Sequence, residues 1–292
     1  MDRLSIVLVI VESNDFQLAQ ELAAQESAQR LGVDLHVVKI EEDAIQQSQQ
    51  VLRLLQRQES ERPNGIMFEP VGTPLAQAAK LAAASGIGWA ILSRESVDYV
   101  KQLRSSFPKT PIFSITTSHE EVGRIQGEQI GRLLRQGGNI LYIQGPAGNE
   151  AAIERAAGML KTKPANVDVR IVKGMWSEQS AYNSVTSWLQ LSTNREIRIR
   201  LVAAQNDAMA LGARRALESF GASSIPFLGC DGLPSGGQSA VRRKLLAATV
   251  AIPPNAGQAL EAMVKALRTG VPVDETIRTA PSSYPPLGDL RG

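Results

Sequence analysis

Polar side chains that can bind a small molecule stand directly after the short apolar runs of this sequence. These groups are Glu12-Ser13-Asn14-Asp15-Phe16, Glu69-Pro70, Ser93-Arg94, residues 144–149, Asn206-Asp207 and Asp231-Gly232. Carboxylates accept hydrogen bonds, arginine donates them in a fixed fork, and amides do both. Such a mixture of donors and acceptors is typical of a site for a hydroxyl-rich ligand.

Two aromatic rings and a further arginine add to this set. Trp176 follows an apolar run and precedes a helix that we expect to begin near Glu178, and Phe16 has a similar setting. Each ring either stacks on the apolar face of a sugar or fills a seam between strand and helix. Arg155 falls in a helix that opens near Glu150, where it either points into a binding site or lies on the surface.

Side chains suited to catalysis or to metal binding are scarce. The two histidines are His36, inside an apolar run, and His119, at a loop-to-helix junction that fits a capping role as well as a functional one. Neither belongs to a readable Ser/His/Asp set, and no HExxH, CxxC or P-loop motif occurs. The turn at residues 145–148 lacks the G-x-G-x-x-G spacing of a dinucleotide site. The sequence therefore predicts a protein that is not an enzyme, with no catalytic residue, metal site or cofactor.

Ten short apolar runs alternate with amphipathic segments and position these residues. The runs are residues 4–11, 33–40, 65–69, 89–92, 112–116, 139–144, 167–172, 199–204, 226–229 and 246–252. Because they are continuous and rich in Val, Ile and Leu, they are typical of parallel strands buried on both faces. We predict an α/β fold with two open sheets of five or six strands, whose ligands bind beyond the carboxyl ends of the strands.

Length and composition are those of a soluble, two-domain globular protein. The chain has 292 residues, of which 43% are hydrophobic and 21% charged, and its net charge is +2. This balance argues against a nucleic-acid or membrane-surface partner, and no apolar stretch is long enough to span a bilayer. The N-terminus runs straight into a strand with no signal-peptide segment. Either a leader has been removed or the protein works in the cytoplasm.

Two smaller features carry expectations of their own. Cys230 is the only cysteine, so it is either a buried small hydrophobe or a reactive thiol beside Asp231. Residues 280–292 contain a Pro-Pro pair and two glycines, and we expect them to form a loosely held terminus.

An ordered series of motifs runs along most of the chain. The most specific are QNDAMALGA at residues 205–213, GCDGLP at 229–234 and ATV at 248–250. Weaker matches are SNDF at 13–16, GIMFEP at 65–70, Ser93-Arg94, Gly123, and Arg155 with Gly158. With these motifs the chain resembles the type I periplasmic binding family, in particular its ribose- and galactose-type sugar receptors.

The resemblance implies two Rossmann-like lobes, each an open parallel sheet flanked by helices. It further implies a three-crossing hinge between the lobes and a ligand cleft between them. By position, the crossings lie near residues 116–119, 251–253 and 273–279. The N-terminal lobe is then expected to hold residues 1–116 and 252–276, and the C-terminal lobe residues 117–251 and 277–292.

The motif matches and the strand-end positions together imply eight ligand contacts, which are Asn14, Phe16, Glu69, Arg94, Arg155, Trp176, Asn206 and Asp231. Three positions depart from the family pattern. Ser93 stands where such receptors have Asp, Ser118-His119 where they often have Asp-Asn, and Ile252 where a glutamine often reaches the ligand. Two carboxylates and two amides are missing while both arginines remain. We therefore entertain the hypothesis of a ligand that is less hydroxyl-rich or carries an anionic group.

The resemblance implies a binding protein that captures a sugar or sugar derivative by hinge closure and delivers it to an ABC transporter. Its expected partners are this small molecule and a transporter permease, and its expected location is periplasmic. The alternative is the ligand-sensing domain of a transcriptional regulator or chemoreceptor, because the lactose-repressor family shares the fold. Against a regulator, no helix-turn-helix or basic region precedes residue 4, so the chain as given does not read DNA bases.

Overall fold

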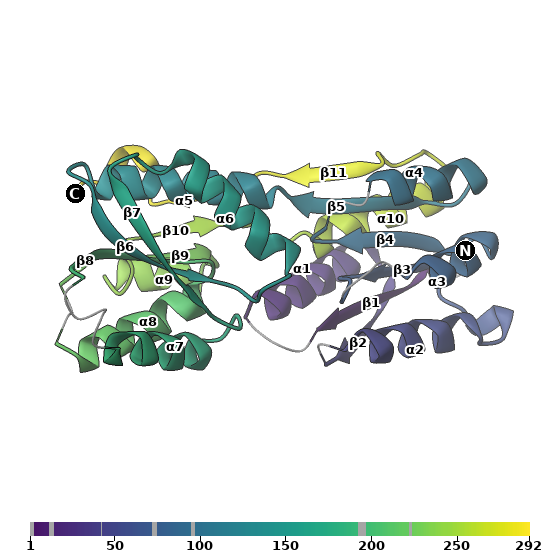
Figure 1. The fold of residues 1–292 in the computed structure, drawn as a ribbon. Helices are drawn as coiled ribbons and strands as arrows, with labels where there is room; N and C mark the ends of the chain where they lie inside the picture. The colour runs from purple at the N-terminus through teal and green to yellow at the C-terminus, as the bar shows by residue number, and fades with distance from the viewer. Residues whose placement is uncertain are drawn as a thin grey trace. The chain divides into compact units, whose positions relative to one another are not determined.

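The computed structural model describes residues 3–11, 15–41, 43–71, 75–94, 97–191, 197–221 and 224–292 (Figure 1). The chain divides into two compact units: unit 1 comprises Met1–Thr116 and Pro254–Thr279, and unit 2 comprises Thr117–Pro253 and Ala280–Gly292. The chain therefore passes between the units after Thr116, Pro253 and Thr279, where the expected passages were after residues 116, 251 and 276. Ile252 stays with unit 2 because its N–H donates to the carbonyl oxygen of Asp231 at 2.9 Å.

Unit 1 is built on a six-stranded sheet with the strand order β11-β5-β4-β3-β1-β2. Strands β1 to β5 pair in parallel. Its helices and strands are β1 (Ser5–Val11), α1 (Asp15–Leu31), β2 (Asp34–Ile40), α2 (Ala44–Leu55), β3 (Gly65–Phe68), α3 (Ala76–Ala84), β4 (Gly88–Leu92), α4 (Val97–Ser106), β5 (Ile112–Thr117), α10 (Ala256–Thr269) and β11 (Thr276–Thr279).

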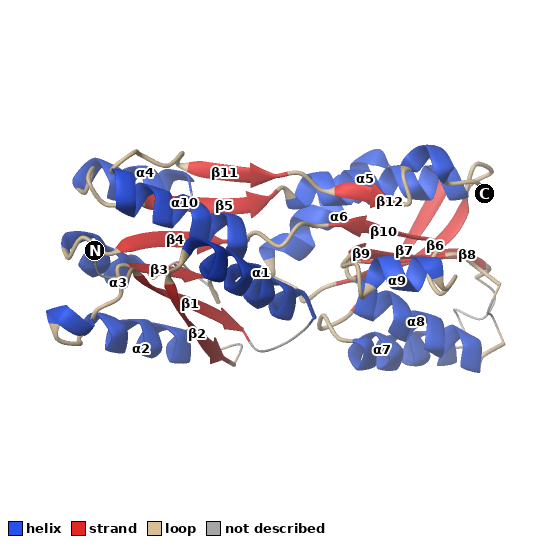
Figure 2. Ribbon diagram, turned by 180° about the vertical axis from the view of Figure 1, so that it is seen from behind, coloured by secondary structure: helices blue, strands red, loops and turns tan. Residues whose placement is uncertain are grey.

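Strand β1 shows why this sheet is covered on both faces. Its side chains alternate between two hydrophobic clusters: Val7 and Val9 pack with α2, α3 and α4, while Ile6, Leu8 and Ile10 pack with α1 and α10. Figure 2 shows α1 and α10 together on one face of this sheet. Because successive strand residues point to opposite faces, a continuous apolar run needs helices on both sides.

Unit 2 repeats the plan with the strand order β12-β10-β9-β8-β6-β7. Strands β6 to β10 pair with one another in parallel, and β12 pairs antiparallel to β10. Its helices and strands are α5 (His119–Leu133), β6 (Gly138–Gln144), α6 (Glu150–Thr162), β7 (Val167–Lys173), α7 (Glu178–Gln190), β8 (Ile199–Ala204), α8 (Asp207–Ser219), β9 (Phe227–Asp231), α9 (Gly237–Arg242), β10 (Ala248–Ala251) and β12 (Ser282–Tyr284). Side chains of β6 alternate between α7, α8 and α9 on one face and α5 and α6 on the other.

The predicted α/β fold with two mainly parallel sheets is confirmed, and each of the ten predicted runs overlaps a strand. Strands β11 and β12 were not predicted, because their sequences, TIRT and SSY, lack an apolar run. Each lies at the edge of its sheet, where one side of the strand needs no partner. Within the described residues, no helix is both long and apolar enough to cross a membrane.

The expectation of a loosely held terminus at residues 280–292 is wrong. Besides forming β12, this tail buries Leu290 to 5% exposure in the cluster that contains Ile130 and Tyr142. Gly292 packs so closely on α5 that a Cβ there would lie 2.3 Å from the carbonyl oxygen of Leu133. Composition alone missed this, because a single leucine placed in a core is enough to order a short segment.

Candidate functional site

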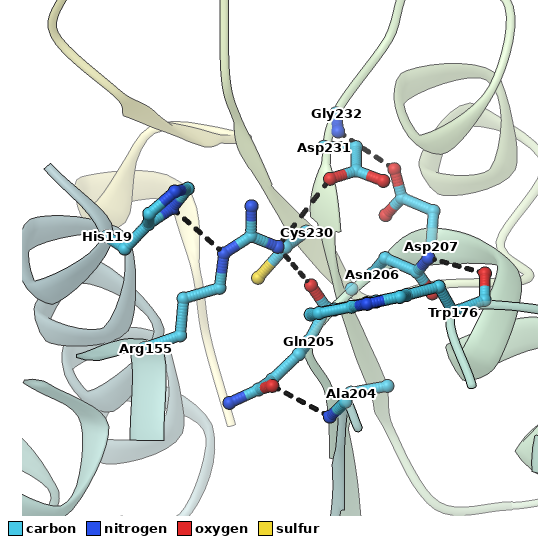
Figure 3. Close-up of polar contacts among 12 residues, drawn as sticks. His119, Arg155, Trp176, Ala204, Gln205, Asn206, Asp207, Cys230, Asp231 and Gly232 are labelled. Atoms are coloured by element: carbon cyan, nitrogen blue, oxygen red, sulfur yellow. Dashed lines mark hydrogen bonds and ion pairs between the residues drawn. The ribbon is translucent and has the colours of Figure 1, made fainter. Parts of the chain in front are cut away.

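Four of the residues predicted to bind a ligand gather at one edge of the sheet in unit 2 (Figure 3). Arg155 comes from α6, Trp176 from the connection between β7 and α7, Asn206 from the start of α8 and Asp231 from the end of β9. The carboxyl ends of the parallel strands β6 to β9 meet at this edge. Ligands of open α/β sheets bind beyond such ends, and we call these four residues with His119 the binding edge of unit 2.

The guanidinium of Arg155 lies at the centre of the binding edge. Its Nε donates to Nδ1 of His119 at 3.4 Å, and its Nη1 donates to the carbonyl oxygen of Gln205 at 2.5 Å. Nη1 also lies 3.7 Å from Oδ1 of Asp231, and Cζ lies 5.7 Å from the ring centroid of Trp176. Since only 7% of Arg155 is exposed, these contacts fix the position of its charge.

The contacts that Arg155 makes with the described residues use Nε and Nη1, which leaves the N–H groups of Nη2 for a ligand (Figure 3). A carboxylate or phosphate bound bidentately needs parallel donors from neighbouring nitrogens, so it would displace one of the existing contacts. Asp231 already balances the positive charge. This geometry disfavours the hypothesis that Arg155 meets an anionic group bidentately.

Two glycines bring α5 and α6 close enough for His119 to reach Arg155. A Cβ on Gly123 would lie 2.0 Å from the carbonyl oxygen of Arg155, and a Cβ on Gly158 would lie 2.0 Å from that of Glu120. Gly123 lies one turn after His119, and Gly158 about one turn after Arg155. The close crossing therefore places these two side chains next to each other at the same end of the helix pair.

Trp176 is positioned by contacts on its backbone and on its ring. Its φ of +58° is left-handed, a conformation that few residues other than glycine adopt. Its carbonyl oxygen accepts a hydrogen bond from Nδ2 of Asn206 at 2.8 Å, while Oδ1 of Asn206 caps α8 by accepting from the N–H of Met209 at 2.8 Å. The ring lies against Gly145, where a Cβ would be 2.4 Å from Cζ2. Asn206 thus uses both polar atoms to hold Trp176 and the helix.

A second carboxylate, Asp207, lies next to the turn that carries Asp231. Its Oδ1 accepts from the hydroxyl of Thr249 at 2.6 Å, and its Oδ2 accepts from the N–H of Gly232 at 2.8 Å. Burial raises the pKa of Asp207 well above its ordinary value and the charge of Asp231 raises it further, while the two hydrogen bonds act to lower it. Because Asp231 has a left-handed φ of +92°, the bond to Gly232 helps to hold a strained turn.

Gln205 and Cys230 lie on the inner side of the same edge. Gln205 is fully buried, and its Nε2 donates to the hydroxyl of Tyr142 at 2.9 Å and to the carbonyl oxygen of Ala152 at 2.7 Å. Its Oε1 accepts from the N–H of Gly145 at 2.8 Å. Cys230 is 1% exposed, and burial raises the pKa of its thiol. Of the two expectations for Cys230, the structure supports the buried small hydrophobe.

In unit 1, the predicted residue Glu69 lies in a hydrogen-bonded group at the end of β3. Its Oε2 accepts from Nε2 of Gln17 on α1 at 2.9 Å and from Oγ of Ser93 at 3.4 Å. Nε2 of Gln47 fixes the backbone by donating to the carbonyl oxygen of Glu69 at 2.7 Å. Segments that follow β3 and β4 therefore meet α1 around one carboxylate.

Gln20 joins this group to the start of α10. Its Nε2 donates to Oγ of Ser93 at 3.2 Å and to Oδ1 of Asn255 at 3.0 Å. Its Oε1 accepts from the N–H groups of Asn255 and Ala256 at 2.7 and 2.8 Å. Asn255 stands just after the passage into unit 1 at Pro254, so this fully buried glutamine ties the returning chain to α1.

Phe16 and Arg94, the other predicted residues of unit 1, are both half-buried. Phe16 lies in the first turn of α1 and Arg94 follows Ser93 after β4. Asn14 lies outside the described residues. Within the described part of the chain, no group of three or more His, Cys, Asp or Glu side chains is arranged to hold a metal ion.

Three glutamines of these networks, Gln17, Gln20 and Gln205, were not identified from the sequence as parts of a site. Gln205 had a signal, because it directly precedes Asn206 in the most specific motif. Gln17 and Gln20 had none, since a glutamine on an amphipathic helix is most often exposed.

Comparison with known proteins gives concordant matches over most of the chain. The family model described as a periplasmic binding protein domain matches residues 6–271. The ribose import binding protein of Escherichia coli (strain K12) is 28% identical over 261 residues, covering 85% of this chain and 78% of that protein. The D-allose-binding periplasmic protein of the same strain is 26% identical over 277 residues, covering 90% and 85%. Among solved structures, an ABC transporter periplasmic solute binding protein from Actinobacillus succinogenes 130z with bound D-allose has a TM-score of 0.81 at 21% identity, covering 96% of this chain and 97% of that chain.

Proposed function

This chain belongs to the periplasmic binding protein domain family, and from that premise we propose that it captures a neutral sugar or polyol and delivers it to an ABC transporter. The family is one of binding proteins rather than enzymes. Relatives that match most of the chain are named for ribose and D-allose, which supports a ligand of this class.

The surroundings of Arg155 carry the proposal. Nη2 of Arg155 offers N–H donors, the carboxylate of Asp231 accepts hydrogen bonds, and Trp176 offers an aromatic face within 5.7 Å of the guanidinium. A sugar needs all three, because its hydroxyls both donate and accept while its C–H face is apolar. Because Arg155 and Asp231 balance each other's charge, a neutral ligand leaves no uncompensated charge at this edge.

We propose direct ligand contacts from both units, namely Asn14, Phe16, Glu69 and Arg94 in unit 1 and Arg155, Trp176 and Asp231 in unit 2. Asn206 acts mainly by holding Trp176. Closure of the units on the ligand, as expected from the resemblance, would make binding favour a single closed state that a permease recognises. We also propose that the protein works in the periplasm or outside the cytoplasmic membrane, in line with the description of its family.

A thermal-shift screen tests the ligand class. The panel contains ribose, D-allose and myo-inositol, with glucuronate and ribose 5-phosphate as anionic counterparts. A ligand at 100 times its Kd adds about 2.7 kcal/mol of stability, which raises Tm by several degrees in a domain of this size. We expect a neutral member to produce this shift. A shift with the anionic members alone would refute the proposed ligand class.

The variant Arg155→Lys tests the proposed site. Lysine keeps the positive charge but cannot contact His119, Gln205 and a ligand at once, so we expect Kd to rise at least about tenfold, roughly 1.4 kcal/mol. The matched control is Arg215→Lys, since Arg215 lies 4.5 Å from the ring centroid of Tyr182 but is half-exposed on α8. Calorimetric titration should leave the control within about twofold of wild type. Equal effects of the two variants would place the ligand elsewhere.

A further inference from the structure

His119 is the one imidazole of the binding edge, and the hydrogen bond it makes depends on its protonation state. The bond runs from Nε of Arg155 to Nδ1 of His119, at 3.4 Å. Arginine is always protonated and donates only, so Nδ1 must present its lone pair. The imidazole that fits this geometry is therefore neutral, with its proton on Nε2. Protonation of Nδ1 would turn an N–H toward an N–H and place two positive charges side by side.

The surrounding elements keep this pair together. The crossing at Gly123 and Gly158 leaves no space between the backbones of α5 and α6, and only 7% of Arg155 is exposed. Nη1 of Arg155 is held at the same time by the carbonyl oxygen of Gln205. Protonation of the half-buried His119 would therefore break this contact, and the guanidinium that lies beside Asp231 would lose the hydrogen-bond partner of its Nε.

Other titratable and charged groups lie on the elements around this pair, namely Glu154 and Lys161 on α6, Glu120, Glu121 and Arg124 on α5, Cys230 and Asp231 on β9, Asp207 on α8 and Tyr284 on β12. Lys161 pairs with Glu120, and Arg124 with Glu121. Burial keeps the Cys230 thiol protonated at neutral pH, and Asp231 pairs with Arg155. Because the pKa of Asp207 is raised, this carboxylate also gains a proton as the pH falls. The test must therefore distinguish the protonation of Asp207 from the protonation of His119.

We propose that His119 is a positioning residue that holds Arg155 in its binding geometry only while its imidazole is neutral, so that ligand affinity falls on acidification. This inference rests on the proposed function. Because binding and protonation then compete, they are linked, and one released proton allows Kd to rise by at most tenfold for each pH unit. Imidazole is the side chain whose charge normally changes between pH 8 and 5, so the loss of affinity should occur in that interval.

The two histidines of the chain provide a matched pair of variants. His119→Asn places an amide oxygen close to the position of Nδ1, so it can accept from Arg155 but does not titrate. His36→Asn is the control, since His36 is exposed on β2 in the other unit. Kd for ribose, D-allose and myo-inositol is measured by calorimetry at pH 7.5, 6.5 and 5.5. We expect Kd to rise at least about fivefold over this range in wild type and in His36→Asn, and to stay within about twofold in His119→Asn.

A pH dependence that persists in His119→Asn would assign it to Asp207 or another carboxylate and overturn the inference. A pH-independent Kd in wild type would overturn it as well.

A measurement without ligand keeps the inference testable if none of the three sugars binds, an outcome that would count against the proposed function alone. Long-range proton–nitrogen NMR spectra of ¹⁵N-histidine-labelled protein report the tautomer of each imidazole. We expect His119 to carry its proton on Nε2 at pH 7.5. Its titration midpoint should move to higher pH in Arg155→Met, while that of His36 stays in place. A proton on Nδ1, or an unmoved midpoint, contradicts the proposed pairing.

Discussion

At the scale of single residues, the binding edge of unit 2 depends on Asp207, a buried side chain outside the set that defines it. Asp207 accepts hydrogen bonds from Thr249 on β10 and from Gly232 after β9. Gly229 and Gly237 pack directly on this carboxylate, because a Cβ at either position would lie within 2.1 Å of one of its oxygens. The position of the Asp231 turn is therefore set by a buried carboxylate that touches three segments.

The titration of Asp207 gives stability a definite pH dependence. Its pKa is raised in the folded protein, chiefly by burial and then by Asp231, so folding favours its protonated form. That contribution is fully present below the unfolded pKa of about 3.9 and is lost as pH rises through the folded pKa. We expect the unfolding free energy of wild type minus that of Asp207→Asn to decrease from pH 4.5 to 8. Its slope should be at most about 1.4 kcal/mol per pH unit.

Urea unfolding of both proteins at several pH values measures this difference. Asp168→Asn is the matched control, because Asp168 is exposed on β7 and the substitution replaces the same carboxyl group in the same unit. If the wild-type advantage over Asp207→Asn grew with pH, the folded state would favour the charged carboxylate and our description of this site would be wrong.

At the scale of elements, the close crossing of α5 and α6 decides where His119 and Arg155 meet. Gly123→Ala would place a methyl group 2.0 Å from the carbonyl oxygen of Arg155, and the two helices would have to separate. Overpacking of this kind costs about 1–3 kcal/mol, and we expect ligand affinity to fall as well, because separation breaks the contact between His119 and Arg155.

Gly131→Ala on the same helix is the control for Gly123→Ala. A Cβ at Gly131 would lie 3.3 Å from Cγ of Pro164, a tight contact with a side chain rather than with a backbone. The gain in helix propensity, about 1 kcal/mol, should offset it. Chemical denaturation and calorimetric titration of both variants check this contrast. Comparable losses of stability in the two variants would show that the Gly123 crossing is not specially constrained.

At the scale of the whole molecule, the last 13 residues return to unit 2 after the chain has completed unit 1, from Ala280 to Gly292. Leu290 packs in the same cluster as Ile130 of α5 and Ile140 of β6. We expect Leu290→Ala to lower the unfolding free energy by about 2–3 kcal/mol, because it removes buried methyl groups and leaves a cavity. Leu160→Ala on α6 is the matched control, since Leu160 is 44% exposed, and its effect should stay within about 0.5 kcal/mol.

Calorimetric or denaturant unfolding of the two leucine variants distinguishes an ordered tail from a loose one. A Leu290→Ala protein as stable as Leu160→Ala would mean that the tail contributes no packing in solution.

Most of the strands and the family resemblance are predicted from local sequence alone. Apolar runs such as SIVLVIV of β1 require burial on both faces wherever they occur, and this local property predicts buried parallel strands. The QNDAMALGA and GCDGLP motifs mark the ends of β8 and β9, and they predict Asn206 and Asp231 as ligand contacts. The prediction of buried parallel strands is confirmed, because it depends on residues that are neighbours along the chain.

Which polar groups meet depends on tertiary packing. His119 and Arg155 are 36 residues apart, and Gln20 and Asn255 are 235 apart. The first pairing depends on how closely α5 and α6 pack. The second depends on where the chain lies as it returns to unit 1 at Pro254. The strands β11 and β12 also depend on the tertiary structure. Their short polar sequences become strands only beside the edge of an existing sheet. Periodicity and motifs describe what each segment must bury, whereas the partners of a buried polar atom follow from packing across the whole fold.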